Sequence, residues 1–372
     1  MKNKTLVAVT TILLSIILFN ACQKDDIEIP TVSPEKIVAL GKEIFFDKGL
    51  SNPVGQSCSS CHNPATAFSD PNHNAVSPGA VDGLFGNRNA PSIAYAMFSP
   101  SLYWSTEDSS YKGGFFWDGR VNTLEEQAQK PFLNMLEMDN IDASMVIGKL
   151  KNSRTYTLYQ QVYGEVGDVD KAFDNIAKAL AAYERSAELN PFTSKFDYYL
   201  KGQASLSAQE LNGLQLFKDT LRAQCTNCHS ADPDPVSGKI LFTDFTYTND
   251  GVPKNPNNPY YTIPSSFNPL GVNYIDDGIG AFLGNHHFDG EFKVSSLRNI
   301  ALTAPYFHNG SFNTLEDVVH FYNTRDVPNS GFAPPEVAST VDTVETGNLH
   351  LTAQEEAYIV AFLKTLTDGY RP

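Results

Sequence analysis

The chain has 372 residues, of which 41% are hydrophobic and 19% charged, an ordinary globular composition with enough length for two domains. Its formal net charge is −15, which argues against nucleic acid or anionic lipid as a partner. An acidic surface favours a basic protein partner, although it also simply promotes solubility.

The N-terminal residues are typical of a targeting segment. Two lysines precede an apolar run over 6–19 that is too short for a good membrane-spanning helix. The run ends before Cys22 in a loose bacterial lipobox, so we expect 1–21 to be a signal peptide and Cys22 to carry a lipid. Residues 22–33 then form an acidic tether, and the protein is expected to be a lipoprotein in the periplasm or at the cell surface. An ordinary signal peptide with an incidental Cys22 is the alternative.

Two long stretches, 63–115 and 230–290, are rich in Pro, Gly, Asn and aromatic residues and show little periodicity. Such a composition predicts long loops with room for a short hairpin. Between and beyond them, helices are predicted over about 123–130, 142–163, 170–187 and 314–323. A capping box at Thr352 begins an amphipathic final helix.

The four remaining cysteines form two Cys-x-x-Cys pairs, each followed at once by histidine. They are Cys58, Cys61 and His62, and Cys225, Cys228 and His229. This is the attachment signature of haem c, in which both sulfur atoms form thioethers with the porphyrin and the histidine ligates the iron. The alternatives are zinc, redox dithiols and disulfides. Zinc leaves both histidines unexplained, and a thioredoxin-like motif needs a βαβ context that is absent.

The two haem sites follow similar segments, which indicates an internal duplication. Residues 41–47 and 213–219 each carry a glycine, a phenylalanine and an aspartate at the same spacing, and both look helical. We therefore predict a mainly α fold of two cytochrome-c-like helical domains, 34–200 and 205–372, each around one covalently bound haem.

In addition, the chain resembles the di-haem cytochrome c peroxidase family, which includes the MauG-type enzymes. The resemblance covers nearly all of the mature chain and rests on both haem motifs and on 87–92, 116–120, 124–127, 294–299 and 304–310. In that family the N-terminal haem reacts with peroxide and the C-terminal haem receives electrons. The resemblance implies that His62 ligates the peroxidatic haem and His229 the electron-transfer haem.

The resemblance also assigns residues around the first haem. Trp117 matches the tryptophan between the haems, Gln127 and Glu137 match the distal amide and carboxylate, and Pro131 shapes the pocket. Cleavage of H2O2 needs a group that takes a proton from the near oxygen and returns it to the departing one, which a carboxylate in an apolar pocket can do. From the residues alone, Glu137 is better explained as a solvated loop glutamate. Trp117 can also be a large core aromatic beside a haem, which is compatible with its place between the haems.

A calcium ion is a further implication of the resemblance. The family holds Ca²⁺ between its domains through an asparagine side chain, backbone carbonyls and waters, and the matching positions are Asn89, Thr303 and Pro305. Oxygen ligands of this kind suit Ca²⁺. The alternative is that Asn89 and Pro305 only shape turns.

The chain departs from ordinary peroxidases of the family at the second haem. The methionine that is the usual second axial ligand falls on Tyr322, and no methionine follows Met145. Tyr322 is therefore the predicted distal ligand, as in MauG-type members, and a phenolate lowers the potential relative to methionine. His320 and the absence of any protein ligand are the alternatives.

Two histidines remain to be assigned. Classical members of the family have a distal histidine that closes the first iron, but His73 fits that position poorly. We expect His73 to lie in a surface loop and the first haem to need no reductive activation. His308 is expected to be structural or a partner of a haem propionate.

Three functions are therefore compared. The leading hypothesis is a peroxidase that reduces H2O2 with electrons from a small c-type cytochrome or cupredoxin. The second is a MauG-like enzyme that oxidatively modifies a partner protein, which Tyr322 favours. A di-haem electron carrier is weakened by the lack of a strong distal ligand at the first iron. Family members often dimerise, so a homodimer is compatible with the resemblance, although no feature of the sequence indicates one.

Overall fold

The computed structural model describes residues 32–372, and residues 34–372 form one compact unit. The signal peptide 1–21, the lipidation site Cys22 and almost all of the tether 22–33 lie outside the described residues, so they stay predictions. Within the described part, no helix combines the length and the apolar character that crossing a membrane requires.

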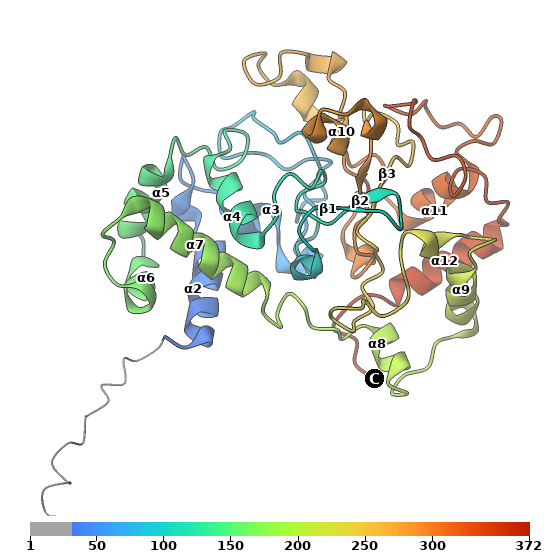
Figure 1. Ribbon diagram of the computed structural model, residues 1–372, viewed down its shortest axis with the longest axis horizontal. Coiled ribbons are helices and arrows are strands. Elements are labelled where there is room, and N and C mark those ends of the chain that lie inside the picture. The colour runs from blue at the N-terminus through green and yellow to red at the C-terminus, as the bar shows by residue number, and fades with distance from the viewer. Residues whose placement is uncertain (1–31) are drawn as a thin grey trace, which may run out of the picture. The chain divides into compact units, whose positions relative to one another are not determined.

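The described chain is mainly helical with long connections, as predicted (Figure 1). The helices are α2 (Pro34–Phe46), α3 (Cys58–Cys61), α4 (Leu124–Leu133), α5 (Ala143–Lys151), α6 (Tyr156–Tyr163), α7 (Val169–Glu184), α8 (Lys195–Leu200), α9 (Ala208–Lys218), α10 (Gly278–Leu283), α11 (Leu315–Thr324) and α12 (Ala353–Lys364). The stretch 142–163, predicted as one helical segment, contains two helices. Its break lies at Asn152, which ends α5 and donates Nδ2 to Gly148 O at 2.8 Å.

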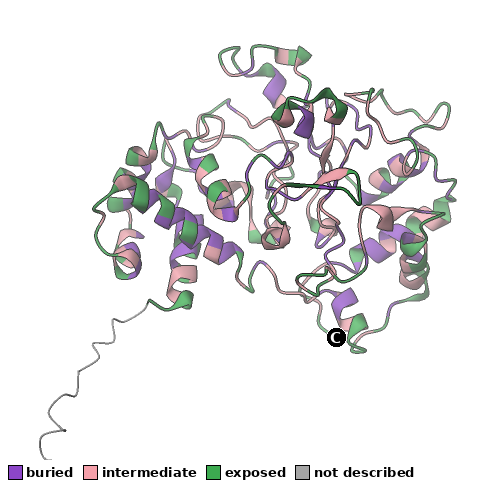
Figure 2. Cartoon of the chain, viewed as in Figure 1, coloured by how far each residue is buried: buried purple, intermediate pink, exposed green. Residues whose placement is uncertain are grey.

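Two hydrophobic clusters form the cores, and their buried faces are visible in Figure 2. The first runs in sequence from Leu40 to Leu189 and is built by α2, α4, α5, α6 and α7. The second runs from Phe196 to Leu366 and is built mainly by α9, α11 and α12. The predicted domain limits, 34–200 and 205–372, stay predictions, and α8 contributes Phe196 to the second cluster.

One glycine in each cluster lets two helices approach closely. A Cβ on Gly41 of α2 would lie 1.8 Å from Ala179 O on α7, and one on Gly213 of α9 would lie 1.9 Å from Tyr358 O on α12. No side chain fits at such distances. The two similar segments therefore share a glycine because each packs its helix closely against another helix at that residue.

Replacement of Gly41 by alanine should destabilise the protein by about 1–3 kcal/mol, because the added methyl group forces α2 away from α7. Denaturant unfolding of the holoprotein measures this. Gly148→Ala on α5 is the matched control, because no heavy atom lies within 4 Å of its Cβ position. That variant should gain up to about 1 kcal/mol from helix propensity. Equal free energies of unfolding for the two variants would contradict the close contact.

Short strands join the two halves of the chain. The strand β1 (Tyr103–Ser105) forms a hairpin with β2 (Ser110–Lys112), and β3 (Tyr247–Thr248) pairs antiparallel with β4 (Phe292–Lys293). A bridge between Lys112 and Thr246 connects the hairpin to the second ladder. The segment after β2, which carries Trp117, thereby lies against β4, where Lys293 N donates to Trp117 O at 2.9 Å.

Candidate active site

A cavity of about 470 Å³ reaches both Cys-x-x-Cys-His segments. It is lined by all four cysteines, both adjacent histidines, and the side chains assigned above from distant parts of the chain: Cys58, Cys61, His62, Trp117, Gln127, Pro131, Glu137, Cys225, Cys228, His229 and Tyr322. Most other lining residues are apolar. The fold therefore brings the predicted haem-binding and distal residues to one cavity.

The two histidines are held in the same way. Nδ1 of His62 lies 3.1 Å from Phe68 O, and Nδ1 of His229 lies 3.0 Å from Phe242 O. A carbonyl can only accept, so Nδ1 carries the hydrogen and Nε2 keeps its lone pair, the arrangement found in metal-ligating histidines. Burial lowers the pKa of both rings, that of His229 to about 4, so both are neutral.

The cysteines fit thioether attachment better than thiolate chemistry. Burial raises the pKa of Cys58 to about 12 and that of Cys61 to about 11, so their ionised forms are disfavoured. Burial raises the pKa of Cys225 to about 12 as well. No group of three or more His, Cys, Asp or Glu side chains within residues 32–372 is arranged to hold a metal ion. The donor set of two thiols and one neutral histidine at each site fits haem c.

Glu137 and Gln127 share one side of the cavity. Gln127 and Pro131 lie on α4, and Glu137 lies in the turn that follows it. Burial raises the pKa of Glu137, opposed by a hydrogen bond from Asn134 and by the charge of Arg120. A carboxyl group with a raised pKa at an apolar cavity is suited to take up and release a proton near neutral pH.

Tyr322 reaches the cavity from α11, on the side of the second Cys-x-x-Cys pair. Its Oη donates to Asp250 Oδ2 at 3.2 Å. Burial and the nearby carboxylate raise the pKa of Tyr322 well above its ordinary value, and burial raises that of Asp250 to about 7. His320 on the same helix does not line the cavity, and its side chain is 53% exposed and 3.0 Å from Glu356 Oε1.

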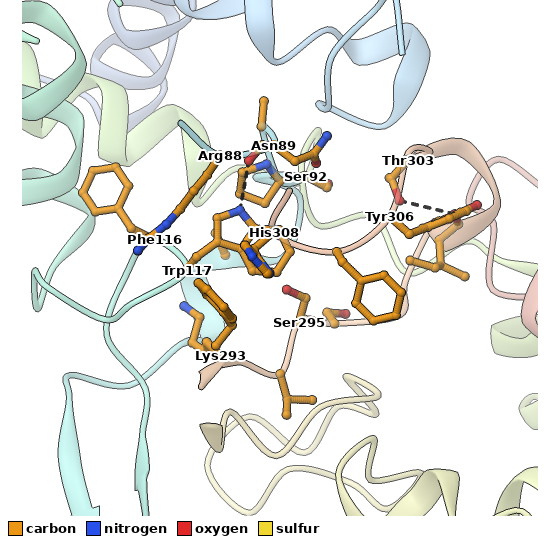
Figure 3. Close-up of a pocket in the computed structure, with 18 of the residues that line it drawn as sticks. Arg88, Asn89, Ser92, Phe116, Trp117, Lys293, Ser295, Thr303, Tyr306 and His308 are labelled. Carbon is orange, nitrogen blue, oxygen red and sulfur yellow. Dashed lines mark hydrogen bonds between the residues drawn. The ribbon is translucent and has the colours of Figure 1, made fainter. Parts of the chain in front are cut away.

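Trp117 lies where the two halves of the chain meet (Figure 3). Its indole Nε1 donates to Asn89 O at 2.9 Å, and its own carbonyl accepts from Lys293 N at 2.9 Å. On the opposite side, Asn89 N donates to His308 O at 2.7 Å. Trp117 is therefore held by backbone contacts to both halves.

These contacts reveal a repeat that our sequence analysis missed. Phe115 pairs with Val121 and Tyr306 pairs with Phe312 in matching bridges, which place Trp117 and His308 at equivalent positions. A threonine caps the helix that follows in each case. The patterns Phe-Phe-Trp-Asp-Gly and Tyr-Phe-His-Asn-Gly were the available signal. Pro131 and Tyr322 are then equivalent as well, each seven residues after the first residue of its helix.

All three residues predicted to bind calcium line the cavity: Asn89, Thr303 and Pro305. Nδ2 of Asn89 is directed at the carbonyl oxygens of Asn74 and Ala75, at 3.3 and 3.2 Å. The amide orientation therefore leaves Oδ1 without a hydrogen bond from any described residue. An asparagine side-chain oxygen and backbone carbonyls are donors of the type that Ca²⁺ prefers.

The two remaining histidines differ in environment. His73 is exposed, with Nδ1 2.8 Å from Ala304 O, and it does not line the cavity. His308 is buried, stacked on Phe292 with ring centroids 3.6 Å apart, and its Nε2 lies 4.0 Å from Glu336 Oε2. Burial lowers the pKa of His308 to about 4, so the ring is neutral in the resting protein.

Two charged residues lie where the two halves of the chain meet, and the sequence analysis assigned no role to either. Arg88 donates to Asp118 and Asp276, each at 2.7 Å, and so ties the first half to the second with a largely buried guanidinium. Lys293 is half-buried beside Trp117, and its Nζ donates to Gly114 O at 2.5 Å. Burial lowers its pKa to about 8. Arg88 lies in 87–92, one of the segments on which the resemblance rests. Lys293 was recognisable only as a lysine between two apolar residues.

Comparison with known proteins gives a consistent result. A family model described as di-haem cytochrome c peroxidase matches residues 35–205. The methylamine utilization protein MauG of Paracoccus denitrificans (strain Pd 1222) is 36% identical, covering 91% of this chain and 90% of the relative. Cytochrome c551 peroxidase of Pseudomonas aeruginosa is 32% identical, covering 81% and 75%. Among solved structures, the diheme peroxidase BthA from Burkholderia thailandensis E264 has a TM-score of 0.78 at 30% identity, covering 91% and 89%.

Proposed function

Because this chain belongs to the di-haem cytochrome c peroxidase family, which includes the MauG-type enzymes and carries two c-type haems, we propose that it is a peroxidase. It reduces H2O2 to water with two electrons and two protons, and a small c-type cytochrome or cupredoxin supplies the electrons. The observation that carries the proposal is Glu137, a half-buried carboxyl with a raised pKa in the cavity that His62 also lines.

In this proposal each group has a separate task. The haem at each Cys-x-x-Cys-His site supplies the redox chemistry. Glu137 takes a proton from the near oxygen of H2O2 and returns it to the departing one, and Gln127 orients the substrate by hydrogen bonding. Pro131 provides no side-chain ligand, so the distal side stays accessible to H2O2. Trp117, held by both halves, lies on the route between the two sites.

A second candidate is favoured by Tyr322. If Tyr322 ligates the second iron, its anionic oxygen stabilises the oxidised state, which suits an enzyme that stores oxidising equivalents and modifies a partner protein, as in MauG-type members. Glu137 serves both functions equally. The two candidates differ in whether electrons come from a reduced redox protein in repeated turnover or from residues of a protein substrate.

Steady-state kinetics separates these candidates. Purified holoprotein is mixed with H2O2 and a reduced small c-type cytochrome, and oxidation of the cytochrome is followed in its absorption band. Repeated turnover that removes one H2O2 for two electrons supports the peroxidase. Consumption of H2O2 that stops after about one equivalent without a protein substrate favours the MauG-like function. No consumption at all would support an electron carrier and contradict both proposals.

We also propose that Asn89, Thr303 and Pro305 hold Ca²⁺. Replacement of Asn89 by alanine removes a direct ligand, so it should weaken Ca²⁺ binding by more than about tenfold. Calorimetric titration of the chelated holoprotein with CaCl2 measures this. Because Asn89 O accepts from the Trp117 indole, removal of Ca²⁺ should also change the fluorescence of Trp117. Asn72→Ala, in an exposed turn, is the control, and wild-type affinity in Asn89→Ala would contradict the site.

For localisation, we propose a lipid-anchored protein in the periplasm or at the cell surface, on the basis of the lipobox-like sequence before Cys22. Replacement of Cys22 by serine should move the protein from the membrane fraction to the soluble extracytoplasmic fraction. An unchanged distribution would leave an ordinary signal peptide as the explanation. A homodimer stays a prediction from the resemblance alone.

A further inference from the structure

The turn that carries Glu137 is organised by one side chain, that of Asn134. Nδ2 of Asn134 donates to Glu137 Oε1 at 2.7 Å, and its Oδ1 accepts from Leu136 N at 3.0 Å. The main-chain carbonyl of Asn134 accepts from Glu137 N at 3.0 Å and from Asp139 N at 2.9 Å. One asparagine therefore sets the path of the turn and contacts one carboxyl oxygen of Glu137.

The orientation of the Asn134 amide follows from its partners. The backbone N–H of Leu136 can only donate, so it faces Oδ1 and not Nδ2. Nδ2 is consequently directed at Glu137 in both charge states of that carboxyl. In a neutral carboxyl the carbonyl oxygen is the better acceptor, so the oxygen that faces this donor is the one without the proton.

We propose that Asn134 is a positioning residue. Its hydrogen bond keeps Oε1 of Glu137 unprotonated, so that the transferable proton is carried by Oε2. The inference rests on the proposed function, because it concerns the carboxyl that transfers the proton. Oε2 makes no hydrogen bond to another described residue, and Glu137 lines the cavity. Oε2 is therefore the oxygen available to a substrate.

Confinement to Oε2 lets one atom perform both proton transfers. Oε2 takes the proton from the near oxygen of H2O2 and then gives it to the far oxygen, which leaves as water when the O–O bond breaks. Glu137 ends in the charge state in which it began. The two electrons come from the redox partner named above, and the two further protons that complete the reduction to water come from solvent.

Few charged groups face Glu137. Burial is the largest influence and raises its pKa, whereas the hydrogen bond from Asn134 and the charge of Arg120 lower it. Cys58 and Cys61 lie nearby but are uncharged as thioethers. Loss of the Asn134 donor therefore raises the pKa of Glu137 further.

The test uses holoprotein with Asn134→Leu or Asn134→Asp. Leucine has a similar shape without the donor, and aspartate keeps an acceptor for Leu136 N but presents a carboxylate to Oε1. Because the reaction with H2O2 needs ionised Glu137, its rate rises with pH. In both variants this rise should move up by about one pH unit, which means a rate about tenfold lower on the acidic side. In Asn134→Leu the plateau at high pH should be retained.

Asn152→Asp is the matched control. Asn152 also ends a helix and donates Nδ2 to a main-chain carbonyl, Gly148 O at 2.8 Å, but its amide faces no carboxylate. Its pH profile should equal that of the wild type. An equal upward shift in Asn152→Asp would mean that the change at Asn134 is not specific to Glu137.

Infrared spectroscopy of the resting protein provides a readout independent of turnover. At a pH low enough to protonate Glu137, the C=O band that disappears in Glu137→Gln should move to higher frequency in Asn134→Leu, because the carbonyl oxygen loses its hydrogen bond. A lower plateau with no shift of the pH profile or of the band would overturn the inference and leave Asn134 a purely structural role. A wild-type profile without any dependence on Glu137 would instead overturn the proposed function, and the inference with it.

Discussion

Replacement of Glu137 by glutamine should lower kcat/KM for H2O2 by about 10²- to 10⁴-fold, the contribution typical of a positioned acid–base group. Glutamine keeps the size of the side chain and can still interact with Asn134, but it cannot take up a proton. Stopped-flow mixing of holoprotein with H2O2 measures the rate directly. The haem content and thermal unfolding of the variant should match the wild type, because Glu137 contributes no buried ion pair.

The reaction rate with H2O2 should also depend on pH, and the raised pKa of Glu137 predicts the direction of that dependence. Burial raises the pKa of Glu137 above its ordinary value of 4.5, and the ionised form accepts the proton. The wild-type rate should therefore rise with pH through that raised pKa, whereas Glu137→Gln should be slow and lack this rise. Glu291→Gln is the matched control, because burial raises its pKa to about 7 but it does not line the cavity. Equal loss in both variants would contradict a special role for Glu137.

Replacement of Tyr322 by methionine should raise the reduction potential of the second haem by an amount on the order of hundreds of millivolts, within the ~0.8 V that axial ligands span. An anionic oxygen ligand stabilises ferric iron, and a thioether does not. Spectroelectrochemical titration of the holoprotein measures the potential. Low-temperature electron paramagnetic resonance of the ferric protein should show a low-spin signal that changes in this variant beside an unchanged high-spin signal from the first haem.

His320→Met separates the two candidate ligands on α11. His320 is exposed and interacts with Glu356, so its replacement should leave both the potential and the low-spin signal as in the wild type. A change in His320→Met and none in Tyr322→Met would reverse the assignment. Two low-spin signals and no high-spin signal in the wild type would mean that a sixth ligand closes the first iron, and His73 would then be the first residue to replace.

The sequence predicted the fold class because its strongest signals are local and covalent. The Cys-x-x-Cys-His spacing is set by the porphyrin and the capping boxes by backbone chemistry. The glycines of 41–47 and 213–219 are set by a neighbouring helix, since a Cβ there would lie less than 2 Å from a carbonyl oxygen of that helix. The mainly helical class and the family are confirmed. The break between α5 and α6 was missed because no glycine or proline marks it: the residues between the two helices are Asn152, Ser153, Arg154 and Thr155.

The site was predicted less completely, because much of it depends on contacts between the halves of the chain. Glu137, Gln127 and Tyr322 were assigned through the resemblance, and the structure brings them to the cavity, although no measurement yet tests their roles. The contacts of Arg88 with Asp276 and of Asn134 with Glu137 require a known geometry. The salt bridge spans 188 residues, a separation at which periodicity and spacing carry no information.

The equivalence of Pro131 and Tyr322 bears on how the two halves came to differ. If one haem-binding unit was duplicated, its copies began with identical chemistry, and a division of labour required the symmetry between them to be broken. In the proposed division, one position at the same place on the helix of each copy contributes to that break: Pro131 provides no side-chain ligand, whereas Tyr322 has an oxygen that could ligate iron. Exchange of these two residues alone would therefore not exchange the roles of the halves, because the position of Gln127 on α4 is occupied by Val318 on α11.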